Sequence, residues 1–209
     1  MPIRWVVAVF LAIAAGINYA DRAAVSSVFA LLKSDLGASD VVLGALGSVF
    51  LWGYALSSPA AGYLADRHSR SRIVLFSLLG WSAVMAVTGF AADVKSLIVL
   101  RLVLGVVESA YLPAAIALIA EHHGPETRAK AMAVHSIGLN LGVVAGGTVA
   151  GYLGDHFGWR PGFWILGGVG IVYGALGWNL LKDGPGRKPV ERRNAWADLR
   201  ELVTIPSFL

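Results

Sequence analysis

The sequence contains no cysteine, and only 14% of its 209 residues are charged. The absence of cysteine excludes disulfide frameworks, thiolate metal sites and cysteine nucleophiles. Soluble domains carry about 25% charged residues, so this chain has too little charge to cover a surface that faces water. A soluble enzyme, a disordered regulator and a nucleic-acid-binding domain are therefore poor interpretations of the sequence.

Sequence signatures of enzymes are absent as well. The chain has no Gly-x4-Gly-Lys-Ser/Thr phosphate loop, no His-Glu-x2-His zinc motif and no Gly-x-Ser-Gly of intramembrane serine proteases. We expect no enzymatic activity, no cofactor and no metal ion, and energy that comes from an ion gradient rather than from nucleotide hydrolysis.

Apolar residues, in contrast, form long uninterrupted runs, with 56% hydrophobic residues and a mean hydropathy of +0.67. A helix needs roughly 20 apolar residues to cross a hydrocarbon core about 30 Å thick. Six runs are long enough, and the glycines within them allow close helix packing in lipid. The predicted fold class is an all-α membrane protein with six transmembrane helices embedded in the lipid bilayer. The expected spans are 5–30, 41–64, 73–91, 97–120, 129–153 and 163–181.

The 17 lysine and arginine residues are distributed unevenly between the two sides of the predicted bundle. Because basic residues accumulate on the cytoplasmic side, the pattern predicts that both termini are cytoplasmic. Topology thus accounts for the net charge of +4 without a nucleic-acid partner, and we expect a bacterial inner-membrane location. The predicted cytoplasmic side carries Arg4, Arg67, Arg70, Arg72, Arg128, Lys130, Lys182, Arg187, Lys188, Arg192, Arg193 and Arg200.

One internal repeat indicates how the spans are related. The segment Gly62-Tyr-Leu-Ala-Asp66 at the end of the second span recurs, with one change, as Gly151-Tyr-Leu-Gly-Asp155 at the end of the fifth. The second and fifth spans run in opposite directions, as expected for a three-plus-three inverted repeat of the kind found in secondary transporters. Glycines at 138, 142 and 146, and at 147 and 151, predict a close-packing face on the fifth span.

Two of the predicted spans contain ionisable residues at membrane depth. The first span carries Asp21 and Arg22, and the fourth carries Arg101 and Glu108, which are seven residues apart and share a helix face. Each such residue costs at least about 2.5–3.5 kcal/mol at a helix centre unless it is paired or hydrated. We expect the two acids and the two arginines to lie in one layer and to neutralise one another.

This layer allows two interpretations. Asp21 and Glu108 can be proton-coupling sites that alternate between a charged, paired state and a protonated, released state, while Arg22 and Arg101 bind an anionic substrate. Alternatively, ion bridges merely fix the first span against the fourth. Further polar residues are candidates for the substrate path: Asn18, Tyr19, Ser109, His135 and Asn140, together with Trp52 and Tyr54.

The loop between the second and third spans carries a recognisable motif. Gly62 is followed by Asp66-Arg67, and then by Arg70 and Arg72. This pattern resembles the loop signature of the major facilitator superfamily, although Ser69 stands where a glycine is usual. The resemblance implies that Asp66, Arg70 and Glu121 form a cytoplasmic charge cluster that latches the two halves of the transporter in its outward-facing state.

The charged spans sharpen this resemblance. Asn18-Tyr19-x-Asp21-Arg22, Arg101-x3-Gly105-x2-Glu108, Pro113 and Gly158-Trp159-Arg160 with Phe163 resemble the anion:cation symporter branch, which moves sugar acids and other organic carboxylates, often with protons. Gly62-Tyr63-Leu64 and Glu108-Ser109-Ala110-Tyr111 also resemble the spinster-like branch, which exports lysolipids and is the competitor to the first assignment. The resemblance implies secondary transport by alternating access, of a small organic anion or of a lysolipid.

The superfamily fold has twelve helices in two parallel halves. We therefore expect 1–182 to be the N-terminal six-helix half, and 183–209 to be a basic cytoplasmic linker with the start of a seventh helix. A second half, a parallel homodimer that rebuilds it, or a six-helix membrane protein without transport activity remain the alternatives for the complete assembly.

Overall fold

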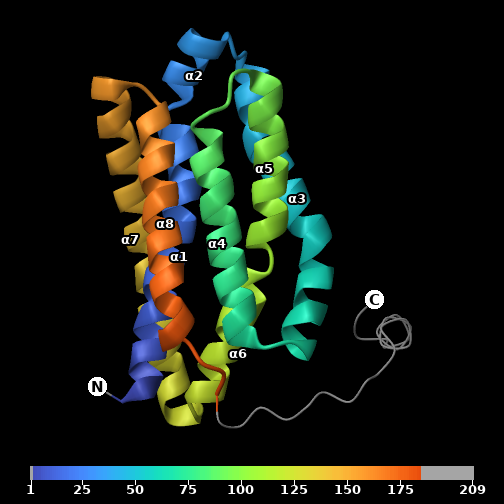
Figure 1. Cartoon of the computed structure of the whole chain (residues 1–209), viewed down its shortest axis with the longest axis vertical. Coiled ribbons are helices and arrows are strands. Elements are labelled where there is room, and N and C mark those ends of the chain that lie inside the picture. Colours follow the sequence, from blue (N-terminus) through green and yellow to red (C-terminus); the bar gives the residue numbers. More distant parts are fainter. Residues whose placement is uncertain (1, 185–209) are drawn as a thin grey trace.

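The computed structural model describes residues 2–184, and in this part of the chain all regular structure is α-helical. Six long helical segments stand side by side, and a short helix, α2, lies at one end of the bundle (Figure 1). Each long segment is apolar enough to cross a membrane, with α5 and α6 forming one span together. The helices are α1 (Ile3–Ser27), α2 (Phe29–Leu36), α3 (Asp40–Arg67), α4 (Arg70–Thr88), α5 (Val94–Glu108), α6 (Tyr111–His122), α7 (Pro125–Phe157) and α8 (Arg160–Leu180).

All six predicted spans are present, but two differ in detail. The first ends at Ser27 rather than continuing to residue 30, because both Ser26 and Ser27 donate side-chain hydrogen bonds to Ala23 O. Such bonds back onto the preceding turn compete with helix continuation. The chain then restarts as α2 and stops at Gly37, which has a left-handed φ of 65°.

The fourth predicted span is interrupted between Glu108 and Tyr111. Pro113 explains the break, because its ring lacks an N–H and would clash with the carbonyl of Ser109 four residues earlier. The Ser109 hydroxyl donates instead to Val106 O at 2.8 Å. The break directly follows Glu108, so that this carboxylate lies where the helix is interrupted.

The packing of the helices confirms the inverted repeat. The helix pairs with the most extensive contacts are α1 with α7, α3 with α5, and α4 with α8. Gly16 faces the α7 backbone and Gly105, 89 residues later, faces the α3 backbone. Gly53 faces α5 and Gly142, again 89 residues later, faces α1. The same small-residue contact is therefore made twice, once in each half of the repeat.

The predicted close-packing face of α7 is also confirmed. A side chain added at Gly138, Gly142 or Gly146 would meet the α1 backbone at Ala12, Gly16 or Ala20. The second series makes less contact, because a side chain at Gly151 would meet nothing within 4 Å. Close approach without side chains is how helices gain van der Waals contact in lipid.

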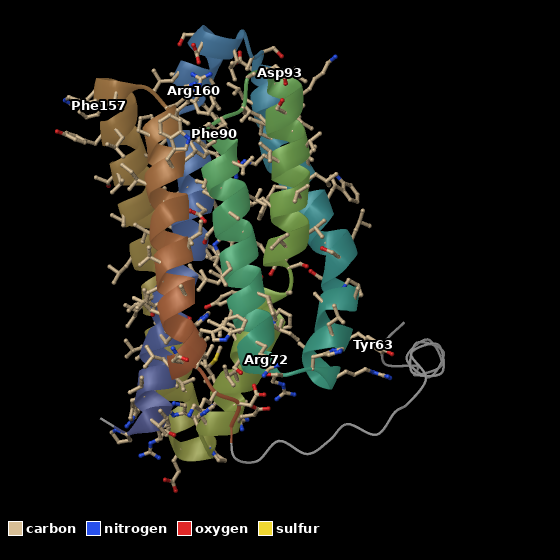
Figure 2. All side chains as sticks on the ribbon, in the orientation of Figure 1. Tyr63, Arg72, Phe90, Asp93, Phe157 and Arg160 are labelled. Carbon is tan, nitrogen blue, oxygen red and sulfur yellow. The ribbon has the colours of Figure 1, made fainter. Side chains whose placement is uncertain are left out.

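The two ends of the bundle differ. Residues 4, 123 and 184 lie at one end, here called the terminal end, where His123 Nε2 contacts Arg4 O at 3.0 Å. Asp93, Phe157 and Arg160 lie at the opposite end, here called the loop end (Figure 2). At the loop end the Asp93 carboxylate caps α5 by accepting from Ser96 N at 2.7 Å, and this bond lowers the pKa of Asp93.

The Gly158-Trp159-Arg160 segment closes the loop end. Gly158 has a φ of 83°, which favours glycine and turns the chain from α7 into α8. Trp159 Nε1 and Arg160 Nη1 both donate to Asp35 Oδ2 on α2, at 2.9 and 2.8 Å. These two donors lower the pKa of the Asp35 carboxyl. Arg160 Nη2 also donates to Ala91 O, so one segment joins α2 to the α4–α5 loop.

Candidate functional site

The centre of the candidate site is an ion pair between the first and fourth spans. Arg22 Nη2 lies 2.8 Å and Arg22 Nε lies 2.9 Å from Glu108 Oε2. The Glu108 side chain is fully buried, whereas 26% of the Arg22 side chain is exposed. The pair therefore joins α1 to the end of α5, and one of its partners remains accessible.

Three aromatic rings surround the Arg22 guanidinium. Its Cζ atom lies 4.7 Å from the ring centre of Tyr19, 4.7 Å from that of Phe50 and 5.1 Å from that of Tyr54. Phe50 and Tyr54 are four residues apart and so lie on the same face of α3. Cation–π contacts of this kind favour the charged arginine and fix its orientation.

Asp21 lies next to this pair but has a different environment. The residue is fully buried, and neither carboxylate oxygen has a hydrogen-bond partner among the described residues. The charges that act on Asp21 are those of Glu108, Arg101 and Arg22. An ionised carboxylate buried without a partner costs several kcal/mol, so Asp21 differs in kind from Glu108, whose charge is paired.

Arg101 is buried as well, and it makes no ion pair with Asp21 or Glu108 within the described part of the chain. Of the two acids and two arginines that we expected to neutralise one another, Arg22 and Glu108 form an ion pair in the structure. Unpaired buried polar atoms collect in the same layer of α1, α4 and α5. They are Asn18 Nδ2, Asp21 Oδ1 and Oδ2, Trp81 Nε1, Ser82 Oγ, Arg101 Nη2 and Glu108 Oε1.

A cavity of about 250 Å³ gives access to this layer from the side of α3. Both Arg22 and Arg101 line it, whereas most of its remaining wall is apolar. Two guanidinium groups beside one cavity can bind a carboxylate or a phosphate, since arginine forms bidentate contacts with both. The apolar wall comes from Val25, Phe29, Leu46, Phe50 and Leu51.

The remaining candidates on the substrate path lie apart from the cavity. Ser109 is buried and accepts a hydrogen bond from Ser57 Oγ at 3.0 Å, which ties the helix break to α3. His135 is buried, with Nε2 at 3.2 Å from the Tyr111 hydroxyl. Asn140 is exposed on α7 and donates to the Ser136 carbonyl at 2.8 Å. Their roles in substrate binding stay predictions.

The charge cluster predicted from the loop motif is assembled at the terminal end. Arg70 Nη1 lies 2.7 Å from Glu121 Oε1, and Arg70 Nη2 lies 3.7 Å from Asp66 Oδ1. Glu121 is nearly buried, whereas the Asp66 side chain is 67% exposed, so the Arg70–Glu121 pair is the stronger of the two. Arg67 stacks over the Tyr63 ring at 4.2 Å.

Two neighbours of this cluster were not expected from the sequence. Ser69, which replaces the usual glycine, caps α4 by accepting from Arg72 N at 3.3 Å. The chain after α8 returns to the cluster, where Gly184 N donates to Glu121 Oε2 at 3.0 Å and Ser71 N donates to Asp183 Oδ1 at 2.8 Å. The predicted linker and start of a seventh helix otherwise lie outside the described residues.

Sequence reasoning did not identify Phe50 and Trp81 as parts of the site. Phe50 has a signal in the sequence, because it precedes Tyr54 by one helical turn. Trp81 has no such signal, since the sequence alone gives no reason to assign an indole within an apolar span any role other than helix packing. Among residues 2–184 no group of three or more histidine, aspartate or glutamate residues could hold a metal ion.

Comparisons with known proteins agree with this geometry. The sequence model of the family described as Major Facilitator Superfamily matches residues 11–209. The chain is 27% identical over 192 residues to a probable galactarate/D-glucarate transporter of Escherichia coli (strain K12), covering 89% of this chain and 42% of that protein. It is 29% identical over 208 residues to protein spinster homolog 1 of Homo sapiens, covering 92% of this chain and 39% of that protein.

The same relationship holds among solved structures. A bacterial homolog of the human lysosomal transporter spinster, crystallised in an inward-facing and unoccupied conformation, superimposes with a TM-score of 0.81 at 26% identity. The alignment covers 100% of this chain and 50% of that one. The chain thus spans about half the length or less of the relatives that it matches.

Proposed function

The chain belongs to the major facilitator superfamily, and on this premise we propose that it is the N-terminal half of a proton-coupled transporter of a small organic anion. The terminal end of the bundle is then cytoplasmic, as the distribution of basic residues predicts. The observation that carries the proposal is the buried layer in which Glu108 is paired with Arg22 while Asp21 has no hydrogen-bond partner among residues 2–184.

The two carboxylates have different roles in the proposed cycle. A proton on Glu108 removes the charge that holds Arg22, and the released guanidinium becomes available to a substrate anion in the adjoining cavity. Asp21 exchanges its proton when the layer opens to water, because hydration removes the cost of ionising a buried acid. Proton binding and anion binding are thereby linked through Arg22.

The charge cluster at Asp66, Arg70 and Glu121 is the proposed cytoplasmic latch. It lies at the terminal end, where Arg70 forms ion pairs with both Glu121 and Asp66. Opening of the cytoplasmic side then requires this end to separate from the second half of the transporter, or from a second copy of the chain.

A second candidate substrate is a lysolipid. The apolar wall of the cavity that Arg22 and Arg101 line suits an anion with a hydrocarbon chain, and the spinster homologs are among the chain's relatives. A sugar acid would leave this wall without polar contacts, whereas a lysolipid phosphate would use both the arginines and the apolar surface.

Uptake into proteoliposomes under an inward proton gradient tests these assignments. We expect accumulation of labelled D-glucarate that collapses when a protonophore is added, and Asp21→Asn and Glu108→Gln should each abolish gradient-driven uptake. Lysophosphatidylglycerol transport in place of glucarate uptake would favour the second candidate. Gradient-driven uptake of either compound by both variants would refute the proton sites. Absence of any transport by this chain, with transport by a version extended through twelve helices, would show that the half is inactive alone.

A further inference from the structure

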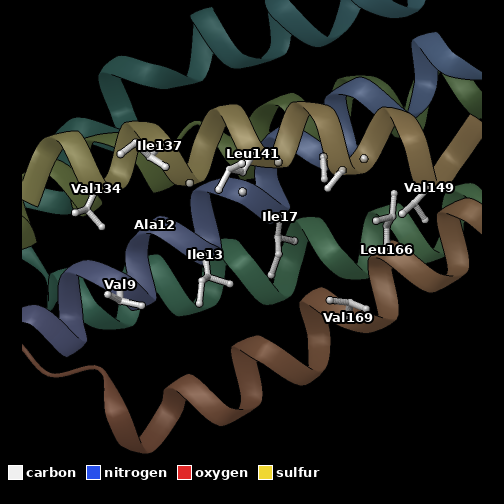
Figure 3. Close-up of a pocket in the computed structure, with 16 residues that line it drawn as sticks. Val9, Ala12, Ile13, Ile17, Val134, Ile137, Leu141, Val149, Leu166 and Val169 are labelled. Carbon is white, nitrogen blue, oxygen red and sulfur yellow. The ribbon is translucent and has the colours of Figure 1, made fainter. Parts of the chain in front are cut away.

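A long apolar groove runs along the bundle between α1, α7 and α8 (Figure 3). Its volume is about 460 Å³, and its floor is the small-residue seam at which α1 crosses α7. α8 lies close to α7 near Leu166 and Val149 and diverges from it toward Val134 (Figure 3), and it lines the groove through Leu166 and Val169. Val9, Ile13 and Ile17 of α1 line its length.

The groove does not belong to the charged site. Its α1 residues Ile13 and Gly16 lie on the opposite side of that helix from Asn18 and Arg22, given 3.6 residues per turn. The other two walls are apolar residues of α7 and α8, several of which are exposed, among them Ile137 at 58%, Leu141 at 64% and Val169 at 52%. In a membrane-spanning bundle such a groove lies at the depth of the hydrocarbon core.

The chemistry of the groove fits a hydrocarbon chain and nothing that needs a hydrogen bond. Every side chain in its wall is apolar. Along α1 the lining extends from Val9 to Ala20, which corresponds to roughly 16 Å at a rise of about 1.5 Å per residue. One leaflet contributes about half of the roughly 30 Å hydrocarbon core, so the groove matches the length of one extended acyl chain.

A single basic residue follows the same helix face out of the groove. Lys130 precedes Val134 by four residues and Leu141 by eleven, so the three side chains lie on one stripe of α7. Lys130 is exposed and forms no ion pair within residues 2–184. Its position, one helical turn beyond the Val134 end of the groove, is where a headgroup would lie if an acyl chain occupied the groove.

We propose that the groove between α1, α7 and α8 is a binding site for one acyl chain of an anionic phospholipid, with its headgroup phosphate at Lys130. Lysine near a membrane surface attracts anionic lipid, and the positive side of a membrane protein faces the leaflet that carries such lipid. A lipid seated there would cover the α1–α7 seam, and this role is independent of what the protein transports.

Photolabelling tests the site directly. The chain is placed in phosphatidylcholine nanodiscs containing a small fraction of phosphatidylglycerol with a diazirine in its acyl chain, and labelled peptides are quantified by mass spectrometry. We expect labelling to concentrate on the α7 segment 134–149 and on 9–20 of α1. Ala145→Phe, which fills the groove, should lower it roughly tenfold, equivalent to about 1.4 kcal/mol.

Matched variants separate this site from ordinary lipid contact. Val144→Phe adds the same ring to the neighbouring residue, which is 67% exposed and does not line the groove, and should leave labelling unchanged. Unlabelled phosphatidylglycerol should compete with the photolabel better than phosphatidylcholine does. Lys130→Gln should reduce this preference for phosphatidylglycerol about fivefold, whereas Lys95→Gln at the loop end should leave it unchanged.

Three outcomes would overturn the proposal. They are equal labelling of the Ala145→Phe and Val144→Phe chains, an unchanged lipid preference after Lys130→Gln, and labelling spread evenly over all exposed helix faces. Protection of 134–149 from the lipid in the unaltered chain would also overturn it, because another protein surface would then cover the groove. Because Lys130→Gln alters only an exposed side chain, this arm remains informative if Ala145→Phe fails to fold.

Discussion

Replacing Glu108 by glutamine removes one charge of the Arg22–Glu108 pair and keeps the size and an oxygen acceptor of the side chain. Breaking a fully buried pair costs about 3–5 kcal/mol, whereas an exposed pair contributes about 0–1 kcal/mol. Glu108 is fully buried but 26% of the Arg22 side chain is exposed, so the pair lies between these limits. We expect a coupling free energy of about 2 kcal/mol between the two residues.

A double-mutant cycle measures this coupling. The unfolding free energies of the Glu108→Gln, Arg22→Gln and doubly substituted chains are determined by denaturant titration in detergent micelles. Each single substitution should destabilise the chain, and the second should cost about 2 kcal/mol less in the background of the first. Arg22→Lys is the matched control, because it retains the charge but loses bidentate geometry and ring stacking on Tyr19 and Phe50. Effects that add to within about 0.5 kcal/mol would show that the two side chains do not interact.

Three further predictions concern the helix contacts around this pair. Gly142→Ala should destabilise the bundle in thermal unfolding, because the added methyl group meets the Gly16 backbone. Gly151→Ala, whose methyl group meets no described atom within 4 Å, should be neutral or stabilising. Equal effects of the two substitutions would contradict the close packing of α7 on α1. Asp35→Asn should lower the melting temperature at neutral pH. Because the pKa of Asp35 is lowered in the folded chain, its contribution to stability is present above the ordinary pKa of about 4 and is lost as the pH falls below it. The difference in melting temperature from the unaltered chain should therefore vanish in acid. Glu121→Gln should speed hydrogen exchange at Gly184 N and at the start of α4, because the Arg70 ion pair is lost; unchanged exchange there would show that Glu121 does not hold this end together.

The positions of the spans could be predicted from the sequence, because a helix needs roughly 20 apolar residues to cross the hydrocarbon core of a bilayer. The repeated Gly-Tyr-Leu segment likewise predicted the relation between α3 and α7, which the contacts of Gly53 and Gly142 confirm. The break after Glu108 and the early end of α1 were not predicted. The first depends on the backbone hydrogen bond that Pro113 cannot donate, and the second on the side-chain hydrogen bond of Ser26; a hydropathy pattern registers neither.

The site could be predicted as a set of residues but not as a set of pairs. The free-energy cost of a charged side chain at membrane depth was enough to identify four residues, because such residues are rare unless they have a function. They are Asp21, Arg22, Arg101 and Glu108. Helix spacing could not decide that Arg22 rather than Arg101 reaches Glu108, because side-chain reach depends on how α1 and α5 are rotated. Two of the three aromatic rings around Arg22, those of Phe50 and Tyr54, lie on α3, and their contact with Arg22 depends on how that helix is rotated.

The most direct test of proton coupling compares two transport modes of the Asp21→Asn variant in proteoliposomes. Exchange of internal unlabelled D-glucarate for external labelled D-glucarate needs substrate binding and alternating access but no net proton movement. We expect this variant to retain exchange and to lose accumulation driven by a proton gradient. Retention of gradient-driven accumulation would contradict the assignment of Asp21 as a proton carrier, and equal loss of both modes would show that Asp21 serves binding or folding instead.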